Sequence, residues 1–263
     1  PGKLKFFRKI RQNLLMENKT GKYLKYAIGE IVLVVVGILI ALQINNWNQN
    51  RLNAQTEAEL LQAISSKMKF NIRQHTMGST RYKSVIEAAE ALLIASNDPT
   101  IKIHQNKIDE HFSTLSKRFL MGKSNATMIY DEMIGSGQLI LLKSAELRSE
   151  LTSLKANMQL LAAYEDEHLN FVDNQLSPYL NENIDILRAY QNAKQDGYDN
   201  ILALKLDDIP LKPLSVNKVI TERKFSNLMV ELIMNTKKLI PINSRINQNI
   251  TIIDSIASLP ISN

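Results

Sequence analysis

The chain of 263 residues contains no cysteine, which excludes disulfide bonds, thiolate catalysis and cysteine metal sites. Glycine and proline are scarce, with 9 and 7 residues, and no Asn-Gly or Asp-Gly pair joins two alternating apolar segments. Few chain breakers and no hairpin signal favour helices over strands. We therefore predict an all-α fold that does not depend on covalent cross-links.

Catalytic motifs are absent as well. The chain has no glycine-rich phosphate loop, no His-Glu-x-x-His, no Gly-x-Ser-x-Gly and no aspartate-rich calcium loop. These motifs bring together the groups that phosphate transfer, zinc hydrolysis, acyl transfer and calcium binding require. We therefore predict that the protein is not an enzyme and needs no cofactor.

One long apolar segment is present, at residues 26–47, which read YAIGEIVLVVVGILIALQINNW. No polar side chain occurs in residues 31–42, and the mostly apolar run covers 19 residues from Tyr26 to Ile44. A helix of this length, at about 1.5 Å per residue, crosses about 30 Å of hydrocarbon. The segment is therefore predicted to be a transmembrane helix that continues into an extramembrane helical bundle.

A cleaved signal peptide is the alternative interpretation of this segment. Signal peptides have a shorter apolar part, of about 7 to 15 residues, followed by a cleavage site of small residues. Here the run is longer and ends in Gln43, Asn45, Asn46 and Trp47, a border that suits a membrane interface. A permanent anchor is the preferred interpretation.

Positive charge is concentrated before the apolar segment. Residues 1–25 hold eight basic residues and one acid, a net charge of +7, whereas the other 24 basic and 25 acidic residues give −1. The positive-inside rule places residues 1–25 in the cytoplasm and residues 48–263 on the opposite side. Because the large domain is nearly neutral, the pI of 9.3 does not indicate nucleic-acid binding.

The N-terminal segment is predicted to contact anionic lipids. Apolar side chains alternate with basic ones over residues 4–15, a pattern typical of a short helix on the inner leaflet. A disordered basic tail is the alternative. The predicted membrane-surface residues are Lys3, Lys5, Arg8, Lys9 and Arg11.

Small residues mark one face of the predicted span. Gly29, Gly37 and Ala41 share this face, and small residues let transmembrane helices approach closely. Glu30 is the one charge inside the span and lies near its inner end, where it can reach the interface or pair with a lysine. We expect these four residues to contact another membrane protein or a second copy. An anchor whose glycines are incidental is the alternative.

Two segments resemble a known family. FFRKIRQNLLMENKTGKYLKYAIGEIVLVVVGILIALQINNWN, residues 6–48, is similar to the start of an uncharacterised family of single-pass proteins from Bacteroidetes. YDEMIGSGQLILLKSAELRSEL, residues 130–151, resembles that family's element of helix, glycine turn, apolar run and helix. The resemblance implies a bacterial inner-membrane protein with a periplasmic helical domain, and it brings no catalytic residue or ligand.

Breaker residues divide the rest of the chain into helices. The helix of the span is expected to continue to Met77, with a break at Gly78 and Ser79. Further helices are predicted at residues 84–95, 106–119, 127–134, 184–193, 215–238 and 241–258. Asn97 and Pro99 end one helix, Gly135 to Gly137 stop another, and Ser144 caps the next. The longest loop, at residues 195–213, is either a recognition loop or a plain connector.

The clearest apolar periodicity outside the span lies between residues 147 and 161. It comprises Leu147, Leu151, Leu154, Met158 and Leu161. Continued, the stripe reaches Glu165 and His168, half of the Glu-x-x-His pattern of carboxylate-bridged metal sites. No second such motif occurs, and the drift of the stripe around the helix would carry Glu165 toward solvent. The expected alternatives are a satisfied polar pair or an exposed helix edge. A metal site is therefore not expected.

A second apolar seam near the C-terminus contains Asn249. The seam comprises Leu239, Ile242, Ile246, Asn249, Ile253 and Ile256. One asparagine in such a seam can fix the register of a coiled coil, and burial within the domain's own bundle is the preferred explanation.

These observations predict three segments: a basic cytoplasmic segment at residues 1–25, a transmembrane helix at 26–47 and a periplasmic helical domain at 48–263. The function expected of them is a non-catalytic scaffold or accessory subunit of a cell-envelope complex. The alternative is a periplasmic sensor that passes a signal to a separate protein through its transmembrane helix.

Overall fold

The computed structural model describes residues 20–98, 105–115, 119, 121–123, 127–185, 187 and 219–259. The chain divides into two compact units, Pro1–Ala58 and Glu59–Asn263, which are considered separately. Every regular element in the described ranges is helical, and they contain no strand. The predicted all-α fold class is confirmed for these residues.

Helix α2, Thr20–Asn97, is 78 residues long and contributes to both units. It includes the apolar segment, and no residue of its most apolar 18-residue window, with a mean hydropathy of 2.6, is buried. By length and composition this helix can cross a membrane. Asp98 follows the helix, so its end at Asn97 agrees with the predicted stop.

The break expected at Gly78 and Ser79 was wrong, because α2 runs through both residues. Glycine inside a helix costs about 1 kcal/mol relative to alanine. Met68 and Tyr82, within three turns on either side of Gly78, are completely buried in the core. Burial of such side chains contributes about 1.5 to 3 kcal/mol each, which outweighs the cost of the glycine.

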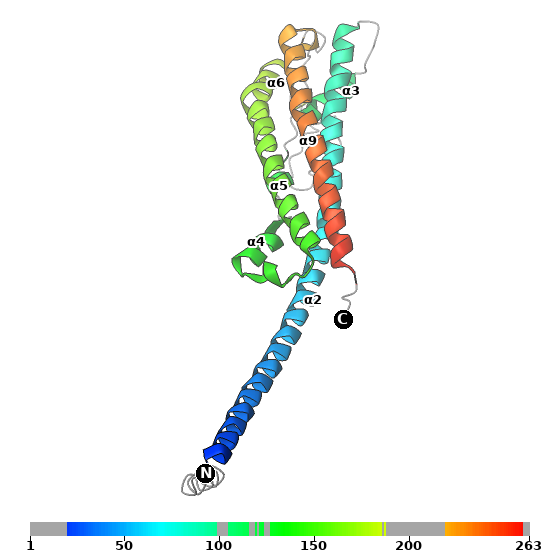
Figure 1. Ribbon diagram of the computed structural model, residues 1–263. Helices are drawn as coiled ribbons and strands as arrows, with labels where there is room; N and C mark the ends of the chain where they lie inside the picture. Colours follow the sequence, from blue (N-terminus) through cyan, green and yellow to red (C-terminus); the bar gives the residue numbers. More distant parts are fainter. Residues whose placement is uncertain are drawn as a thin grey trace. The chain divides into compact units, whose positions relative to one another are not determined.

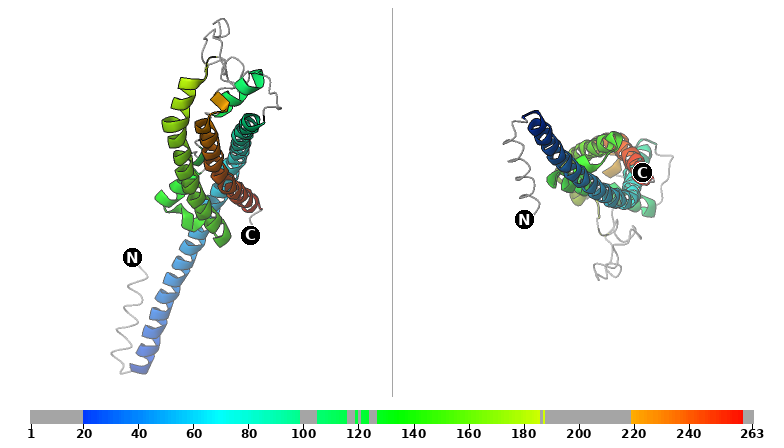
Figure 2. Two further views of the ribbon diagram at one scale, coloured as in Figure 1. Left: turned by 90° about the horizontal axis from the view of Figure 1, so that it is seen from above. Right: turned by 60° about the horizontal axis from the view of Figure 1, so that its bottom comes forward.

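Within the described residues, the second unit contains the end of α2 and eight further elements. These are α3 (Gln105–Leu115), η1 (Met121–Lys123), α4 (Met128–Gly135), η3 (Gln138–Leu141), α5 (Ala145–Phe171), η4 (Val172–Leu176), α6 (Ser177–Asn183) and α9 (Arg223–Ala257). Helices α5 and α9 lie side by side with the part of α2 that begins at Glu59 (Figure 1, Figure 2). This three-helix arrangement forms the frame of the unit.

One hydrophobic core joins the three long helices. Helix α5 contributes the predicted stripe, all of it buried: Leu147, Leu151, Leu154, Met158 and Leu161. Ile64 and Leu92 of α2 and Leu232 and Ile246 of α9 belong to the same cluster. The stripe was therefore a correct indicator of the core face of α5.

Residues 223–257 form one helix, whereas two helices separated before Pro241 were expected. Pro241 lies inside α9, where it lacks the backbone N–H that would bond to the carbonyl four residues earlier. Leu239 and Ile242 flank the proline and are buried in the core. Their packing holds the helix together across the missing hydrogen bond.

The connection between α4 and α5 agrees with its sequence signals. Gly137 has a φ of 72°, a left-handed conformation that glycine adopts without strain. The Oγ of Ser144 accepts a hydrogen bond from the backbone N–H of Leu147 at 3.1 Å, so the predicted cap is present. The glycine turn and the serine cap together set where α5 begins.

Several predicted segments lie partly or wholly outside the described residues. Helix α3 ends at Leu115 rather than Phe119, and Ile184, where a helix was expected to start, has extended backbone after the end of α6. Most of the helix predicted at 184–193, the loop at 195–213 and residues 1–19 are not described.

Candidate functional site

The predicted packing face of the span lies on the first part of α2. Gly29, Glu30, Gly37 and Ala41 are all exposed. A Cβ atom built at Gly29 or Gly37 would meet nothing within 4 Å. At 3.6 residues per turn the four residues fall within an arc of about 120°. No described residue of this chain covers this small-residue face.

The predicted membrane-surface residues, Lys3, Lys5, Arg8, Lys9 and Arg11, lie outside the described residues. Their contacts with lipid stay a prediction.

Polar side chains cross the core of the second unit at several levels. At one end, the Oγ of Ser65 on α2 donates to Oδ1 of Asp254 on α9 at 2.6 Å. Ser258 lies within 3.0 Å of the same Ser65 oxygen. This level joins α2 to the last turn of α9.

Asn243 on α9 organises the next level. Its amide nitrogen donates to the backbone carbonyl of His75 at 2.8 Å and to the Oγ of Ser79 at 2.6 Å. Its Oδ1 therefore faces Nδ1 of His75, 2.7 Å away, and must accept the hydrogen that this nitrogen carries. The pKa of His75 is lowered because burial disfavours the charged imidazolium, although the bond to Asn243 opposes this shift.

Glu165 is the centre of a third level. Its Oε1 accepts from the hydroxyl of Tyr82 on α2 at 2.9 Å, and its Oε2 accepts from the backbone N–H of Gly122 in η1 at 2.7 Å. Burial and the nearby carboxylate raise the pKa of Tyr82, so its hydroxyl stays a donor. The expected exposed helix edge was wrong, because this carboxyl group is completely buried. Its two hydrogen bonds agree with the other expected alternative, a satisfied polar group.

The stripe on α5 therefore continues through Glu165 and His168 instead of drifting off the core. Glu165 follows Leu161 by four residues, and His168 follows Glu165 by three, so both keep the spacing of the stripe. Helices α2 and η1 supply hydrogen-bond donors to the carboxylate, which apolar neighbours could not do. Nδ1 of His168 lies 3.5 Å from the Oγ1 of Thr236 on α9, and its ring packs against Phe119 with centroids 4.9 Å apart. The described residues contain no group of three side chains arranged to hold a metal ion.

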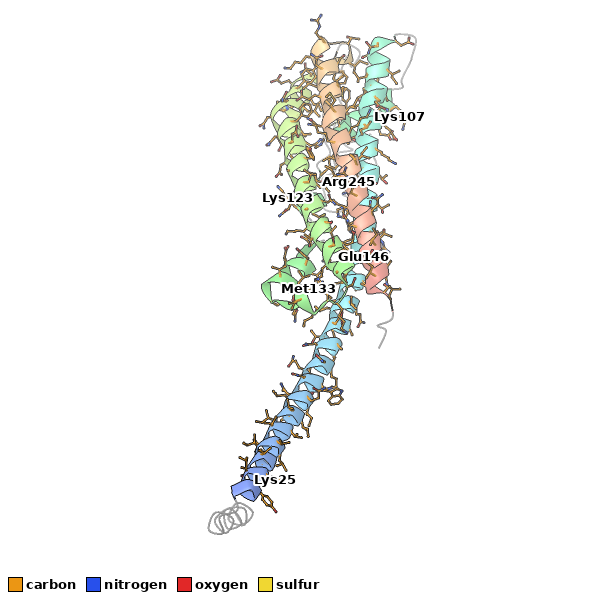
Figure 3. All side chains as sticks on the ribbon, in the orientation of Figure 1. Lys25, Lys107, Lys123, Met133, Glu146 and Arg245 are labelled. Atoms are coloured by element: carbon orange, nitrogen blue, oxygen red, sulfur yellow. The ribbon has the colours of Figure 1, made fainter. Side chains whose placement is uncertain are left out.

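The short η1 turn packs closely on α5. A Cβ atom at Gly122 would lie 2.2 Å from the backbone nitrogen of Ala162, so only glycine fits. Lys123, beside α5 in Figure 3, forms an ion pair with Asp166 at 2.5 Å. Sequence reasoning missed Gly122, since nothing in the local pattern separates it from a loop glycine.

A shallow hollow beside the glycine turn is the other feature that sequence reasoning missed. Its volume is about 480 Å³, and it is lined by Met133, Ile134, Gly137, Leu139, Ile140 and Arg148. The guanidinium of Arg148 donates to the carbonyl of Leu142, so this cation braces the turn. The signal for it was the apolar sequence on both sides of Gly137, within residues 130–151.

Comparison with known proteins gives one match. A family model described as "Family of unknown function (DUF6090)" matches residues 30–208, which include most of the span and the glycine turn. No curated protein and no solved structure matches the chain.

Proposed function

Because the chain belongs to the DUF6090 family, whose description assigns no function, we propose its function from geometry: a membrane-anchored, non-catalytic scaffold or accessory subunit of a cell-envelope complex. In this proposal residues 26–47 cross the inner membrane of a bacterium once. Residues 1–25 lie in the cytoplasm, and residues 48–263 form a helical domain in the periplasm. The partners are another membrane protein or a second copy of this chain.

The uncovered apolar part of α2 is the observation that carries the proposal. Leu33, Leu39 and Trp47 expose more than half of their surface, as do most large apolar side chains between them. Leaving such a side chain in water costs about 1.5 to 3 kcal/mol relative to burial. A bilayer removes this cost along the whole segment, which supports insertion in a membrane.

The small-residue face supports a role for the span beyond anchoring. Lipid tails are as apolar as leucine, so helices associate in membranes through close packing rather than through the hydrophobic effect. Gly29 and Gly37 leave space into which a second helix fits, with no neighbour within 4 Å of either Cβ position.

The polar groups of the second unit support a non-catalytic role. Catalytic acids and bases lie in a cleft, within hydrogen-bond reach of a substrate. Glu165 instead directs both oxygens at Tyr82 and Gly122, and Asn243 satisfies its amide within the core. These groups stabilise helix packing.

In-cell photo-crosslinking tests the proposal. With a photoreactive residue at Ala41, we expect cross-links to a membrane protein or to a second copy, and Gly37→Leu should reduce their yield about tenfold by filling the contact. Val35→Trp is the matched control, because residue 35 lies about 200° around the helix from residue 37 and the substitution adds a comparable volume. Equal yields in both variants, or a lone monomer with no cross-link after gentle solubilisation, would overturn the proposal.

A sensor is the second candidate, favoured by the continuity of α2. One uninterrupted helix, α2, belongs to both units. In a sensor, this helix would be the route by which a change in the second unit reaches the span. The hollow beside Gly137 is a possible place for a small molecule. A compound that raises the melting temperature of the whole chain, with loss of the effect in Ile140→Asp, would favour a sensor over a scaffold.

A further inference from the structure

The part of α2 in the second unit carries an unbalanced positive charge. Between Leu60 and Ile86 it has five basic residues and no aspartate or glutamate. The five are Lys67, Lys69, Arg73, Arg81 and Lys83. Residues 48–263 as a whole hold 24 basic and 24 acidic residues and carry no net charge, so this concentration is local.

Two large apolar side chains lie among these cations. Phe70 is 58% exposed and Met77 is 48% exposed. They are seven residues apart, so they lie on nearly the same line along the helix, about 10 Å from each other. Arg73 and Arg81 lie within about 40° of that line. We call Lys67, Phe70, Arg73, Met77 and Arg81, together with Lys69 and Lys83 on its flank about 90° and 130° around the helix, the cationic face.

The cationic face points away from the core. Ile64, Asn71 and Tyr82 are buried, and their side lies roughly opposite the line through Phe70 and Met77. The Nζ atom of Lys67 lies over the Phe70 ring, 6.0 Å from the ring centroid. The face is therefore open over about four turns of α2.

Five lysines elsewhere in the second unit have counter-ions. Lys107, Lys123, Lys155, Lys237 and Lys238 form ion pairs with carboxylates at 2.5 to 3.1 Å. Within the described part of the chain, the five cations of the cationic face form no ion pair. Their charge is available to an external anion.

We propose that the cationic face binds an acidic amphipathic helix of a partner protein. Carboxylates of that helix would pair with Arg73 and Arg81, because the planar guanidinium matches a carboxylate in two parallel hydrogen bonds. Apolar side chains one and two turns apart on the partner would cover Phe70 and Met77. The inference rests on the proposed function, because it names a class of partner for the proposed scaffold. It does not require that residues 26–47 insert in a membrane.

The apolar pair favours a protein over a polyanion. A phosphate-rich polymer binds through charge and is strongly weakened by salt. It gains little from a phenyl ring and a thioether that alternate with two arginines along the helix. A helical protein segment uses both kinds of contact at the spacing that the cationic face presents.

A direct binding experiment tests this inference on the full chain in a neutral detergent. The probe is a labelled 21-residue helical peptide with leucines on one face, seven residues apart, and glutamates beside them, followed by fluorescence anisotropy. We expect R73E/R81E to weaken binding at least about tenfold and F70A/M77A to weaken it about threefold or more. A scrambled peptide of the same composition should bind more weakly than the helical one.

The matched control is R223E/R245E, which changes net charge equally at two exposed arginines of α9 (Arg245 is labelled in Figure 3). We expect it to change the dissociation constant less than about twofold. Far-ultraviolet circular dichroism melts check that each variant folds, which the exposed positions should allow.

Several outcomes would overturn the inference. The first is no binding at roughly 100 µM peptide, and the second is equal losses in R73E/R81E and R223E/R245E. The third is no loss in F70A/M77A together with equal competition by polyphosphate or by phosphatidylglycerol vesicles. Concentration-dependent dimerisation through the same residues would assign the face to a second copy instead. Gly37→Leu should leave peptide binding unchanged, so failure here is distinct from failure of the proposed role of the span.

Discussion

The hydroxyl of Tyr82 on α2 donates to Oε1 of Glu165 on α5 at 2.9 Å, and both side chains are completely buried. A buried carboxylate is costly unless donors satisfy it, and here the second oxygen binds the backbone N–H of Gly122. Three separate elements, α2, η1 and α5, therefore meet at one carboxyl group. Its partners give the most direct tests of how the second unit is held together.

Tyr82→Phe should lower the free energy of unfolding by about 1.5 to 3 kcal/mol, because it removes a hydrogen bond to a buried carboxylate and leaves that oxygen unsatisfied. Thermal or urea unfolding followed by circular dichroism measures the loss. Tyr130→Phe is the control. Its hydroxyl lies 3.2 Å from the hydroxyl of Thr152, a neutral partner, so a loss of about 0.5 to 1.5 kcal/mol is expected. Equal losses would argue against a special role for Glu165.

Gly122→Ala should destabilise the second unit by about 1 to 3 kcal/mol or displace η1 from α5, because the new Cβ would overlap the backbone of Ala162, which has little room to move. Hydrogen exchange of the η1 amides and the melting temperature report the two effects. Gly135→Ala is the matched control at the end of α4, where an added Cβ meets nothing within 4 Å. It should leave stability unchanged or raise it by up to about 1 kcal/mol.

The buried His75 predicts a pH dependence of stability. The pKa of His75 in the folded protein is lowered from the ordinary value of 6.5. Above pH 6.5 its imidazole is neutral in both the folded and the unfolded chain, so it does not reduce the free energy of unfolding there. As the pH falls below about 6.5 the unfolded chain takes up a proton first, and stability declines by at most about 1.4 kcal/mol per pH unit. Urea unfolding between about pH 5 and pH 7.5 measures this slope.

His75→Gln should flatten that decline, since glutamine does not titrate and its amide can still donate toward Asn243. His111→Gln is the comparison, because burial also lowers the pKa of His111, which is only partly buried. A decline that is as steep in His75→Gln as in the unchanged chain would contradict the assignment to His75.

The apolar stripe of α5 was predictable from sequence because five apolar residues repeat at helical spacing. Its continuation was not. The 4 and 3 spacing reaches Glu165, but only the donors from Tyr82 and Gly122, 83 and 43 residues away, make burial of its carboxylate favourable. Long-range partners of this kind leave no mark on the local sequence.

Pro241→Ala should raise the free energy of unfolding by about 1 to 2 kcal/mol, because it restores a backbone N–H inside α9 and removes the steric clash of the ring. The gain is below the full cost of a proline because the unfolded chain also becomes more flexible. Ser244→Ala, at another exposed position of α9, should gain only a few tenths of a kcal/mol, about 0.5 at most. Denaturant midpoints compare the two variants.

Helix boundaries were predicted well where they depend on hydrogen bonds and turns between neighbouring residues. They were predicted poorly where they depend on packing against other helices. The Ser144 cap and the Gly137 turn depend on neighbours within three residues, and both were correct. Gly78 and Pro241 were expected to interrupt helices, yet buried residues on both sides override their local cost. Asn249 was expected in the α9 seam, but Ile250 is the buried residue, and Asn249 lies at the edge, where it bonds to Asn157 and Glu150.

The polar levels of the core have a mechanical consequence for the second unit. Ser65 pairs with Asp254 and His75 pairs with Asn243, so one register satisfies two separate levels of the antiparallel pair α2 and α9. Sliding either helix by one turn, about 5.4 Å, would unpair both levels at once inside the core. A force along the axis of α2 would therefore move α9 together with α2, and the two helices would shift as one rigid body.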